Sequence, residues 1–324
     1  MRKRFVFGFL CSLILLLGEK CAAQDSVLHR GKDSSRTKIE GVLSDKQMKE
    51  LQRSLDSLLV PARSYFQGGI NYLSNNVYLG RKDTVNMPYI TANVAYYHKS
   101  GLYLNTSFSY LPNSDPGRID LITVEGGYNF KKGKFDGEFS AAKFFFSSLS
   151  NNVKADLKGS LAFLAGYDLG FIKPVVTPTL NISNKLDFTL STGIEHTFYS
   201  EDNDFDITPE FTMNGSTQNY YNSYYRNRKF KVKKKKVTVI EKGTVSGVVL
   251  DASQFKILDY EFTLPANYTY KKFTFNFTPT YAIPVNPAVV SITRQIANQA
   301  PTTVTRNEKI GNSFFWQAGF IYKL

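Results

Sequence analysis

The sequence predicts an all-β protein, a closed antiparallel transmembrane β-barrel of about twelve strands preceded by one short helix. From Ser64 onward, polar and apolar residues alternate with a period of two, as in strands with one polar and one apolar face. Phenylalanine and tyrosine are abundant, with 26 and 20 residues against one tryptophan. After residue 23, no apolar stretch approaches the roughly 20 residues that a membrane-spanning helix needs. Strands are therefore the predicted means of crossing a membrane.

Residues 1–23 predict a secretory signal peptide. A basic start, Arg2-Lys3-Arg4, precedes an apolar run over 5–17 that is too short to cross a bilayer of ~30 Å as a helix. Ala22 and Ala23 supply the small residues of a cleavage site, so we expect Sec-dependent export. Cleavage after Ala23 removes both cysteines, which excludes disulfides and cysteine chemistry from the exported chain.

Residues 24–62 predict a polar segment that contains one amphipathic helix. Ser44 and Gln47 form a capping-box pattern, and Met48 and Leu51 begin an apolar series at helical spacing. We expect this helix either in the periplasm against the barrel rim or inside the barrel as a plug, and the sequence leaves both positions open.

Residues 63–324 predict the barrel itself. Each expected strand carries apolar residues on the face that would meet lipid and polar residues on the other face. In chain order, the expected strands with their outward residues are 64–74 (Phe66, Ile70, Tyr72), 88–98 (Ile90, Val94, Tyr96), 102–110 (Leu104, Phe108), 119–130 (Ile122, Val124, Tyr128), 135–145 (Phe135, Phe139), 155–169 (Leu157, Leu161, Phe163, Tyr167), 173–181, 186–198 (Leu186, Phe188, Ile194), one from near 206, 256–268, 273–283 and 313–324 (Trp316, Phe320, Tyr322).

Short and long connections alternate between these strands, as periplasmic turns and extracellular loops do. The weakest strand is 173–181, because Pro174 and Pro178 cannot donate ladder hydrogen bonds. The valine-rich segment 230–250 has two interpretations. It forms a hairpin outside the wall, or it adds two strands and makes fourteen.

The formal charge of +13 comes mostly from two short segments. Residues 1–23 contribute +3 and one basic tract contributes +8, so the remainder nets +2 (13 − 3 − 8). A nucleic-acid binder would spread its basic residues over a face, so this class is excluded. The tract is either a solvated loop or a contact for lipopolysaccharide phosphates, an acidic solute or a partner. Its residues are Arg226, Arg228, Lys229, Lys231, Lys233, Lys234, Lys235 and Lys236.

The inward faces of the expected strands are rich in acidic residues. One interpretation is a hydrogen-bonded network that fills the lumen. The other is a narrow, water-filled path that prefers cations, because rings of carboxylates favour them. The principal lumen candidates are Glu125, Asp136, Glu138, Asp156, Asp187, Glu195, Asp259 and Glu261, and Asp168, Asp206 and Glu210 also point inward by the alternation.

The last strand resembles the closing strand of outer-membrane barrels. Trp316, Phe320, Tyr322 and Leu324 share one face, similar to the recognition signal of the barrel-assembly machinery. With the signal peptide and the alternating segments, the chain resembles the porin-like outer-membrane β-barrels of Bacteroidetes-type Gram-negative bacteria. The resemblance implies location in the cell outer membrane, contact with its lipid and lipopolysaccharide, and insertion by that machinery.

Enzyme chemistry finds little support in the sequence. Of three histidines, only His196 adjoins an acidic residue, and as neighbours on a strand Glu195 and His196 point to opposite faces. No pattern for a metal or cofactor is present. We therefore expect a narrow passive channel for small polar solutes or cations. The alternative is a structural or docking protein with a periplasmic or surface partner, and an outer-membrane hydrolase is the least supported function.

Overall fold

The computed structural model describes residues 63–82, 86–150, 152–221, 243–296 and 300–324. The predicted signal peptide, the helix within 24–62 and the basic tract at 226–236 lie outside the described residues. The chain divides into two units, and everything below concerns the second, residues 59–324. Within the described part, no helix is long and apolar enough to cross a membrane.

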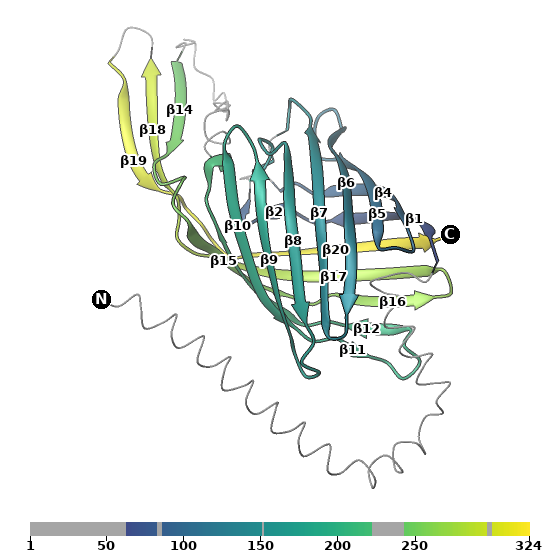
Figure 1. The fold of residues 1–324 in the computed structure, drawn as a ribbon. Helices are drawn as coiled ribbons and strands as arrows, with labels where there is room; N and C mark the ends of the chain where they lie inside the picture. The colour runs from purple at the N-terminus through teal and green to yellow at the C-terminus, as the bar shows by residue number, and fades with distance from the viewer. Residues whose placement is uncertain (1–62, 83–85, 151, 222–242, 297–299) are drawn as a thin grey trace, which may run out of the picture. The chain divides into compact units, whose positions relative to one another are not determined.

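Twelve antiparallel strands close into a barrel, which confirms the predicted fold (Figure 1). The ring closes where β1 pairs with β20, from Gln67 opposite Lys323 to Leu73 opposite Gln317, and β20 pairs in turn with β17. Around the ring the strands are β1 (Tyr65–Leu73), β4 (Tyr89–Tyr97), β5 (Leu102–Leu111), β6 (Arg118–Lys132), β7 (Phe135–Phe146), β8 (Gly159–Tyr167), β9 (Lys173–Ile182), β10 (Leu186–Glu195), β13 (Glu210–Ser216), β15 (Lys256–Thr263), β17 (Phe273–Pro284) and β20 (Ser313–Lys323).

Prolines explain where the wall is interrupted. Pro209 separates β12 (Phe205–Ile207) from β13, and Pro265 separates β15 from β16 (Ala266–Tyr270), because proline has no N–H for the ladder. The short pair β11 (Phe198–Tyr199) and β12 continues the wall beside β16. In β9, the register with β8 skips the positions around Pro178, yet the strand forms as predicted.

The sixth predicted strand begins too early. β8 starts at Gly159, and the preceding residues fold into turns in which the Ala155 N–H bonds to the Asn152 carbonyl and the Leu157 N–H to the Lys154 carbonyl. Leu157, predicted to face lipid, is buried among loop side chains. Asp156, predicted to line the lumen from a strand, lies in this loop.

The structure describes residues 243–250 of the valine-rich segment, and these do not enter the wall. β14 (Gly243–Val249) pairs with β18 (Val289–Ile296), and β18 pairs with β19 (Thr302–Asn307), as a separate three-stranded sheet. Figure 1 shows this sheet beyond one end of the barrel. The fourteen-strand alternative is therefore wrong, because these valines find their partners in the 285–312 connection and leave β13 to pair with β15.

The two ends of the barrel differ in their connections. One end, here the turn end, holds tight turns that each contain a residue with positive φ, namely Gly101, Gly133, Gly170, Asn203 and Lys271. The other, the loop end, holds the longer connections, including a hairpin of β2 (Val77–Tyr78) and β3 (Arg81–Lys82). In barrels of this type, short turns face the periplasm and long loops face outside.

The outer face of the wall is apolar and exposed. Ile70, Val94, Leu104, Phe139 and Phe275 each leave at least half of their surface uncovered. Near the turn end, outward aromatic rings contact one another between neighbouring strands, with centroids 4.8 Å apart for both Phe66–Tyr96 and Phe273–Tyr322. An apolar surface bordered by an aromatic belt is the surface of a protein that spans a bilayer.

Replacing Ile70 with arginine tests this lipid contact. A cation in the middle of an outward strand face should cost about 2–4 kcal/mol of folding free energy in a bilayer. Urea titration of protein folded into phospholipid vesicles measures the loss, with Ile70→Leu as the control that keeps the face apolar. Unchanged stability of Ile70→Arg would mean that lipid does not cover this face.

Candidate functional site

The lumen of the barrel is lined by polar side chains, and it is the candidate site. Inward residues of neighbouring strands lie opposite one another, for example Asn71 opposite Thr91 and Thr91 opposite Ser109. The hydroxyl oxygens of Thr91 and Ser109 are 2.9 Å apart. Asn93 and Asn105 are also inward and keep part of their surface accessible. Away from the loop end, the interior is therefore lined by polar side chains that keep part of their surface accessible, although Oδ1 of Asn93 and Oδ1 of Asn105 are themselves buried without hydrogen-bond partners in the described residues.

A tyrosine hydroxyl joins two of the predicted lumen carboxylates. The Tyr103 oxygen lies 2.6 Å from Oε1 of Glu125 and 2.6 Å from Oε1 of Glu138. A phenol has one hydrogen, so Tyr103 can donate to only one of them at a time. The ring rests on the neighbouring strand at Gly127, where a Cβ would approach it to 2.6 Å. It also ends a stack of inward rings, with centroids 5.1 Å apart for Tyr65–Tyr97 and 5.7 Å for Tyr97–Tyr103.

A lysine that the sequence analysis missed forms ion pairs with two other predicted acids. Nζ of Lys173 lies 3.0 Å from Asp136 and 3.1 Å from Glu195, joining β7, β9 and β10. The side chains of Lys173 and Glu195 are each 25% exposed, so this pair faces accessible space. The bridge crosses β8 at Gly166, where a Cβ would lie 2.4 Å from the lysine Cε. Lys173 is the inward residue at the start of the proline-containing strand, and the alternation there was too weak to reveal it.

A second acidic group lies across the ring from the first. Asp259 and Glu261 are inward on β15, and Glu210 is inward on β13 and accepts a 2.9 Å bond from the Thr212 hydroxyl. β15 is six strands from β6, the strand of Glu125, in either direction round the ring. Asp259 is fully buried, and neither of its carboxylate oxygens has a hydrogen-bond partner within the described residues.

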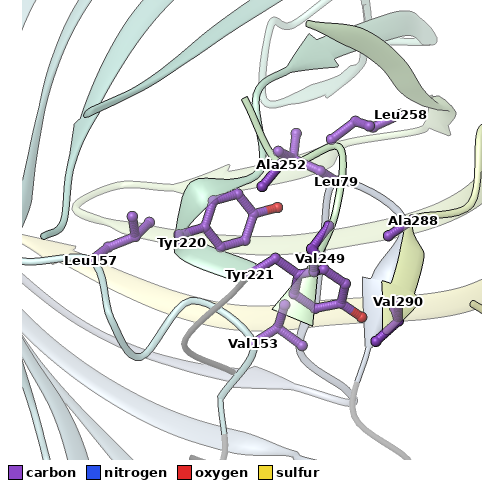
Figure 2. Close-up of a cluster of buried hydrophobic side chains, with 10 residues drawn as sticks. All are labelled: Leu79, Val153, Leu157, Tyr220, Tyr221, Val249, Ala252, Leu258, Ala288 and Val290. Atoms are coloured by element: carbon purple, nitrogen blue, oxygen red, sulfur yellow. The ribbon is translucent and has the colours of Figure 1, made fainter. Parts of the chain in front are cut away.

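The loop end of the lumen is filled by apolar side chains (Figure 2). We call this cluster the loop plug, because its members come from several loops and pack against Leu258 of the wall. All are at least 93% buried, so the plug is a small hydrophobic core and not a loose cover. Its members are Leu79, Val153, Leu157, Tyr220, Tyr221, Val249, Ala252, Leu258, Ala288 and Val290.

A buried arginine fastens the β2–β3 hairpin to the wall. Arg81 is 1% exposed and donates 3.0 Å hydrogen bonds to the carbonyls of Leu79, Leu258 and Asn286. Its Nε lies 3.7 Å from Oε2 of Glu308, whose other oxygen accepts a bond from the Tyr221 hydroxyl. A sequence signal existed for this hairpin, since Val77-Tyr78 and Arg81-Lys82 flank a two-residue turn that ends in glycine.

Buried aspartates anchor the loops. Asp187, predicted to line the lumen, is inward but 0% exposed, and it accepts bonds from the Thr217 hydroxyl and from the N–H groups of Asn219 and Tyr220 at 2.7–2.8 Å. Asp120 accepts bonds from the Tyr89 and Ser150 hydroxyls at 2.6 and 2.7 Å. Asp187 therefore holds the 217–221 segment and presents no charge to the open lumen.

The structure thus gathers only part of the predicted lumen set. Glu125, Asp136, Glu138, Glu195, Asp259 and Glu261 are inward on wall strands, whereas Asp187 is enclosed by loop donors and Asp156 lies outside the wall. Of the last-strand residues, Trp316, Phe320 and Tyr322 are outward on β20, and Leu324 follows its end. Among the described residues, no group of three or more His, Cys, Asp or Glu side chains could hold a metal ion.

Comparison with known proteins gives structural likeness only. No protein-family model and no curated protein matches the chain. Solved structures that are similar include the KdgM porin (10% identity, TM-score 0.39, covering 81% of this chain and 99% of that one), the NanC porin (12%, 0.42, 81% and 100%) and the CymD monoaromatic hydrocarbon channel (9%, 0.33, 85% and 92%). With identities of 12% or less and TM-scores below 0.5, they leave the function to be argued from this chain's own residues.

Breaking the arginine anchor should open the plug. We expect Arg81→Leu to make position 79 accessible, measured as maleimide labelling of Leu79→Cys, a single thiol in a chain with no cysteine after residue 21. Loss of charged hydrogen bonds worth about 1.5–3 kcal/mol each should speed labelling about tenfold or more. Lys82→Leu, which changes the exposed neighbour, is the matched control. Equal labelling rates in all three backgrounds would show that Arg81 does not hold the plug.

Proposed function

We propose that this outer-membrane barrel is a narrow passive channel for small polar solutes or cations. The observation that carries the proposal is the partly exposed polar lumen, with carboxylates on opposite sides of the ring, enclosed by a wall whose outer face is built for lipid. Acidic groups in a pore raise the local concentration of cations. Twelve strands lie between the filled eight-stranded barrels and the open porins of ~16 strands, which fits a narrow path.

The loop plug makes the described conformation a closed one at the loop end. Passage of a solute through the lumen then requires the loop plug to move. The polar groups that attach the plug to the wall favour such a movement. Arg81 Nε and Glu308 Oε2 form an ion pair at 3.7 Å without a hydrogen bond, and both oxygens of Asp259 are buried without hydrogen-bond partners in the described part of the chain. Each such group costs about 1–3 kcal/mol, and hydration on opening would recover part of that cost. The closed state is therefore less favoured than its apolar packing alone would make it.

Ion selectivity tests the channel and its carboxylates. In planar bilayers, the protein should conduct with a preference for K⁺ over Cl⁻, and Glu125→Gln with Glu138→Gln should lower both the conductance and the preference, because glutamine keeps the shape and removes the charge. Reversal potentials in a salt gradient measure the preference. Glu201→Gln, the same change at an exposed turn, is the control.

Absence of conductance from both the folded wild type and folded Arg81→Leu would end the channel proposal. Conductance with unchanged selectivity in the double variant would keep the channel but remove these two glutamates from it.

A docking role is the second candidate, favoured by the sheet outside the wall. All six residues of β19 are exposed, so an edge of this sheet is open to a partner strand. A partner that co-purifies with the full chain and is lost on deleting 24–60 or the basic tract would support docking. Recovery of the bare barrel alone after mild detergent extraction would count against it.

The histidines support a non-enzymatic role. The ring of His196 packs edge-on against Phe198 at 4.5 Å, and His98 lies at a turn, where its Nδ1 is 2.8 Å from the Ser100 hydroxyl. The His98–Ser100 contact joins residues two positions apart in an exposed turn, and within the described residues neither histidine forms an ion pair with a carboxylate. We further propose the Bacteroidetes-type relationship, the contact with lipopolysaccharide and the insertion by the barrel-assembly machinery on the strength of the sequence resemblance.

A further inference from the structure

A small cavity lies between the loop plug and the wall. Its volume is about 240 Å³, and it is bounded by the β2–β3 hairpin, the 152–158 loop and the inward faces of β8, β9 and β10. Ligand pockets for drug-sized molecules occupy ~300–1,000 Å³, so an occupant here must be smaller. The lining combines the Tyr78 ring, apolar Leu157, and the hydroxyls of Ser160 and Thr179 with the ammonium group of Lys154.

Lys154 is the unusual member of this lining. Its backbone is held in place, because its N–H donates to the Asn152 side-chain oxygen at 3.0 Å and its carbonyl accepts from the Leu157 N–H at 2.9 Å. Nζ lies 5.2 Å from the centre of the Tyr78 ring. Burial lowers the pKa of the ammonium group. Lys154 is half-buried, and its ammonium group makes a cation–π contact with the Tyr78 ring, but no carboxylate in the described residues forms an ion pair with it.

Two of the nearby acids have other partners, and the third, Asp156 on the same loop, forms no ion pair with Lys154 in the described residues and keeps its Oδ2 buried without a hydrogen-bond partner. Asp187 accepts bonds from Thr217, Asn219 and Tyr220, as described above. Glu125 lies two strands from Ser160 in register, through Ala142, or roughly 10 Å at the usual strand spacing. Glu125 already accepts from Tyr103. Within the described residues, the charge of Lys154 therefore has the Tyr78 ring beside it and no carboxylate paired with it.

Two hydroxyl groups on the wall strands line the cavity together with Lys154. Within the described residues, the side chains of Ser160 and Thr179 make no hydrogen bond, whereas Asn181 donates to Thr189 at 3.0 Å and Ser191 to Asn214 at 2.6 Å. Hydroxyls beside an unpaired ammonium match a molecule that carries both a carboxylate and hydroxyl groups.

We propose that this cavity binds a small hydroxylated carboxylate, with the carboxylate on Lys154 and its hydroxyl groups on Ser160 and Thr179. The proposal goes beyond the channel function, because an anionic ligand at Lys154 is not the cation that the acidic part of the lumen favours, and the site lies at the loop end, where it can be reached without crossing that part. Binding itself is an equilibrium property and is measured without transport.

Isothermal titration of the exported chain, folded in detergent micelles, tests the site with six-carbon probes that differ in charge. Sodium gluconate should bind, and glucose and glucosamine should bind at least about tenfold more weakly, since a charged hydrogen bond is worth about 1.5–3 kcal/mol. Lys154→Met should weaken gluconate by a similar factor, and Lys154→Arg should retain most of the affinity. Lys158→Met is the matched control, because Lys158 is exposed on the same loop and donates to Asn184.

No gluconate binding by the wild type, or equal affinity in Lys154→Met and wild type, would overturn the proposal. If Lys154→Met does not fold, Ser160→Ala takes its place and should weaken gluconate without touching the loop. Lys154-dependent binding by a barrel that does not conduct would remove the channel function and leave this site standing. Conduction without gluconate binding would remove this site and leave the channel function standing.

Discussion

Inside a bilayer every backbone N–H and C=O must find its partner within the protein, and the closure of β1 onto β20 meets this requirement. The first and last strands of the barrel are almost 250 residues apart in the chain, so the lipid-facing surface is complete only when the whole wall has formed. The apolar outer face depends on that closure, since exposed residues such as Phe66 and Phe275 need lipid and not water around them. The polar inner face depends on it too, because closure creates the lumen.

The lumen is then divided between two kinds of interior. At the loop end, apolar side chains pack as a small core, and the charged groups among them, Arg81 and Asp187, are satisfied mainly by backbone groups. Nearer the turns, polar side chains keep accessible surface, and charges such as Lys173 and Glu195 pair beside open space. Buried polar atoms without hydrogen-bond partners occur in both parts, at Arg81 Nε in the plug and at Asn93 Oδ1 and Asn105 Oδ1 on the wall. The apolar packing at the loop end and the paired charges below it are the two features on which the proposed channel, closed by its own loops, depends.

Alternation of polar and apolar residues predicted nearly all of the wall, because a period of two needs no knowledge of the partner strand. It failed where local hydrogen bonds compete, as in the turns around Asn152 that delay β8 to Gly159. It identified Glu125 and Glu138 as inward but not the Tyr103 hydroxyl between them, since cross-strand register is a tertiary property. The roles of Arg81 and Lys154 could not be predicted from the sequence for the same reason. Both residues lie at the loop end outside the wall strands, where the alternation assigns no face, and the role of Arg81 follows from contacts with residues as distant in the chain as Asn286 and Glu308.

The way polar side chains lie on the wall favours an open path below the plug. Tyr103 lies over Gly127 and Lys173 over Gly166, and a Cβ at Gly319 would approach the Asn71 side chain to 1.8 Å. In each case a side chain extends sideways across the neighbouring strand, at a position where that strand has no side chain of its own. Side chains that run along the wall leave the centre of the lumen free, which side chains pointing straight inward would occupy. A barrel that served only as a scaffold would gain stability by filling this space, so the glycines indicate that the space itself is useful.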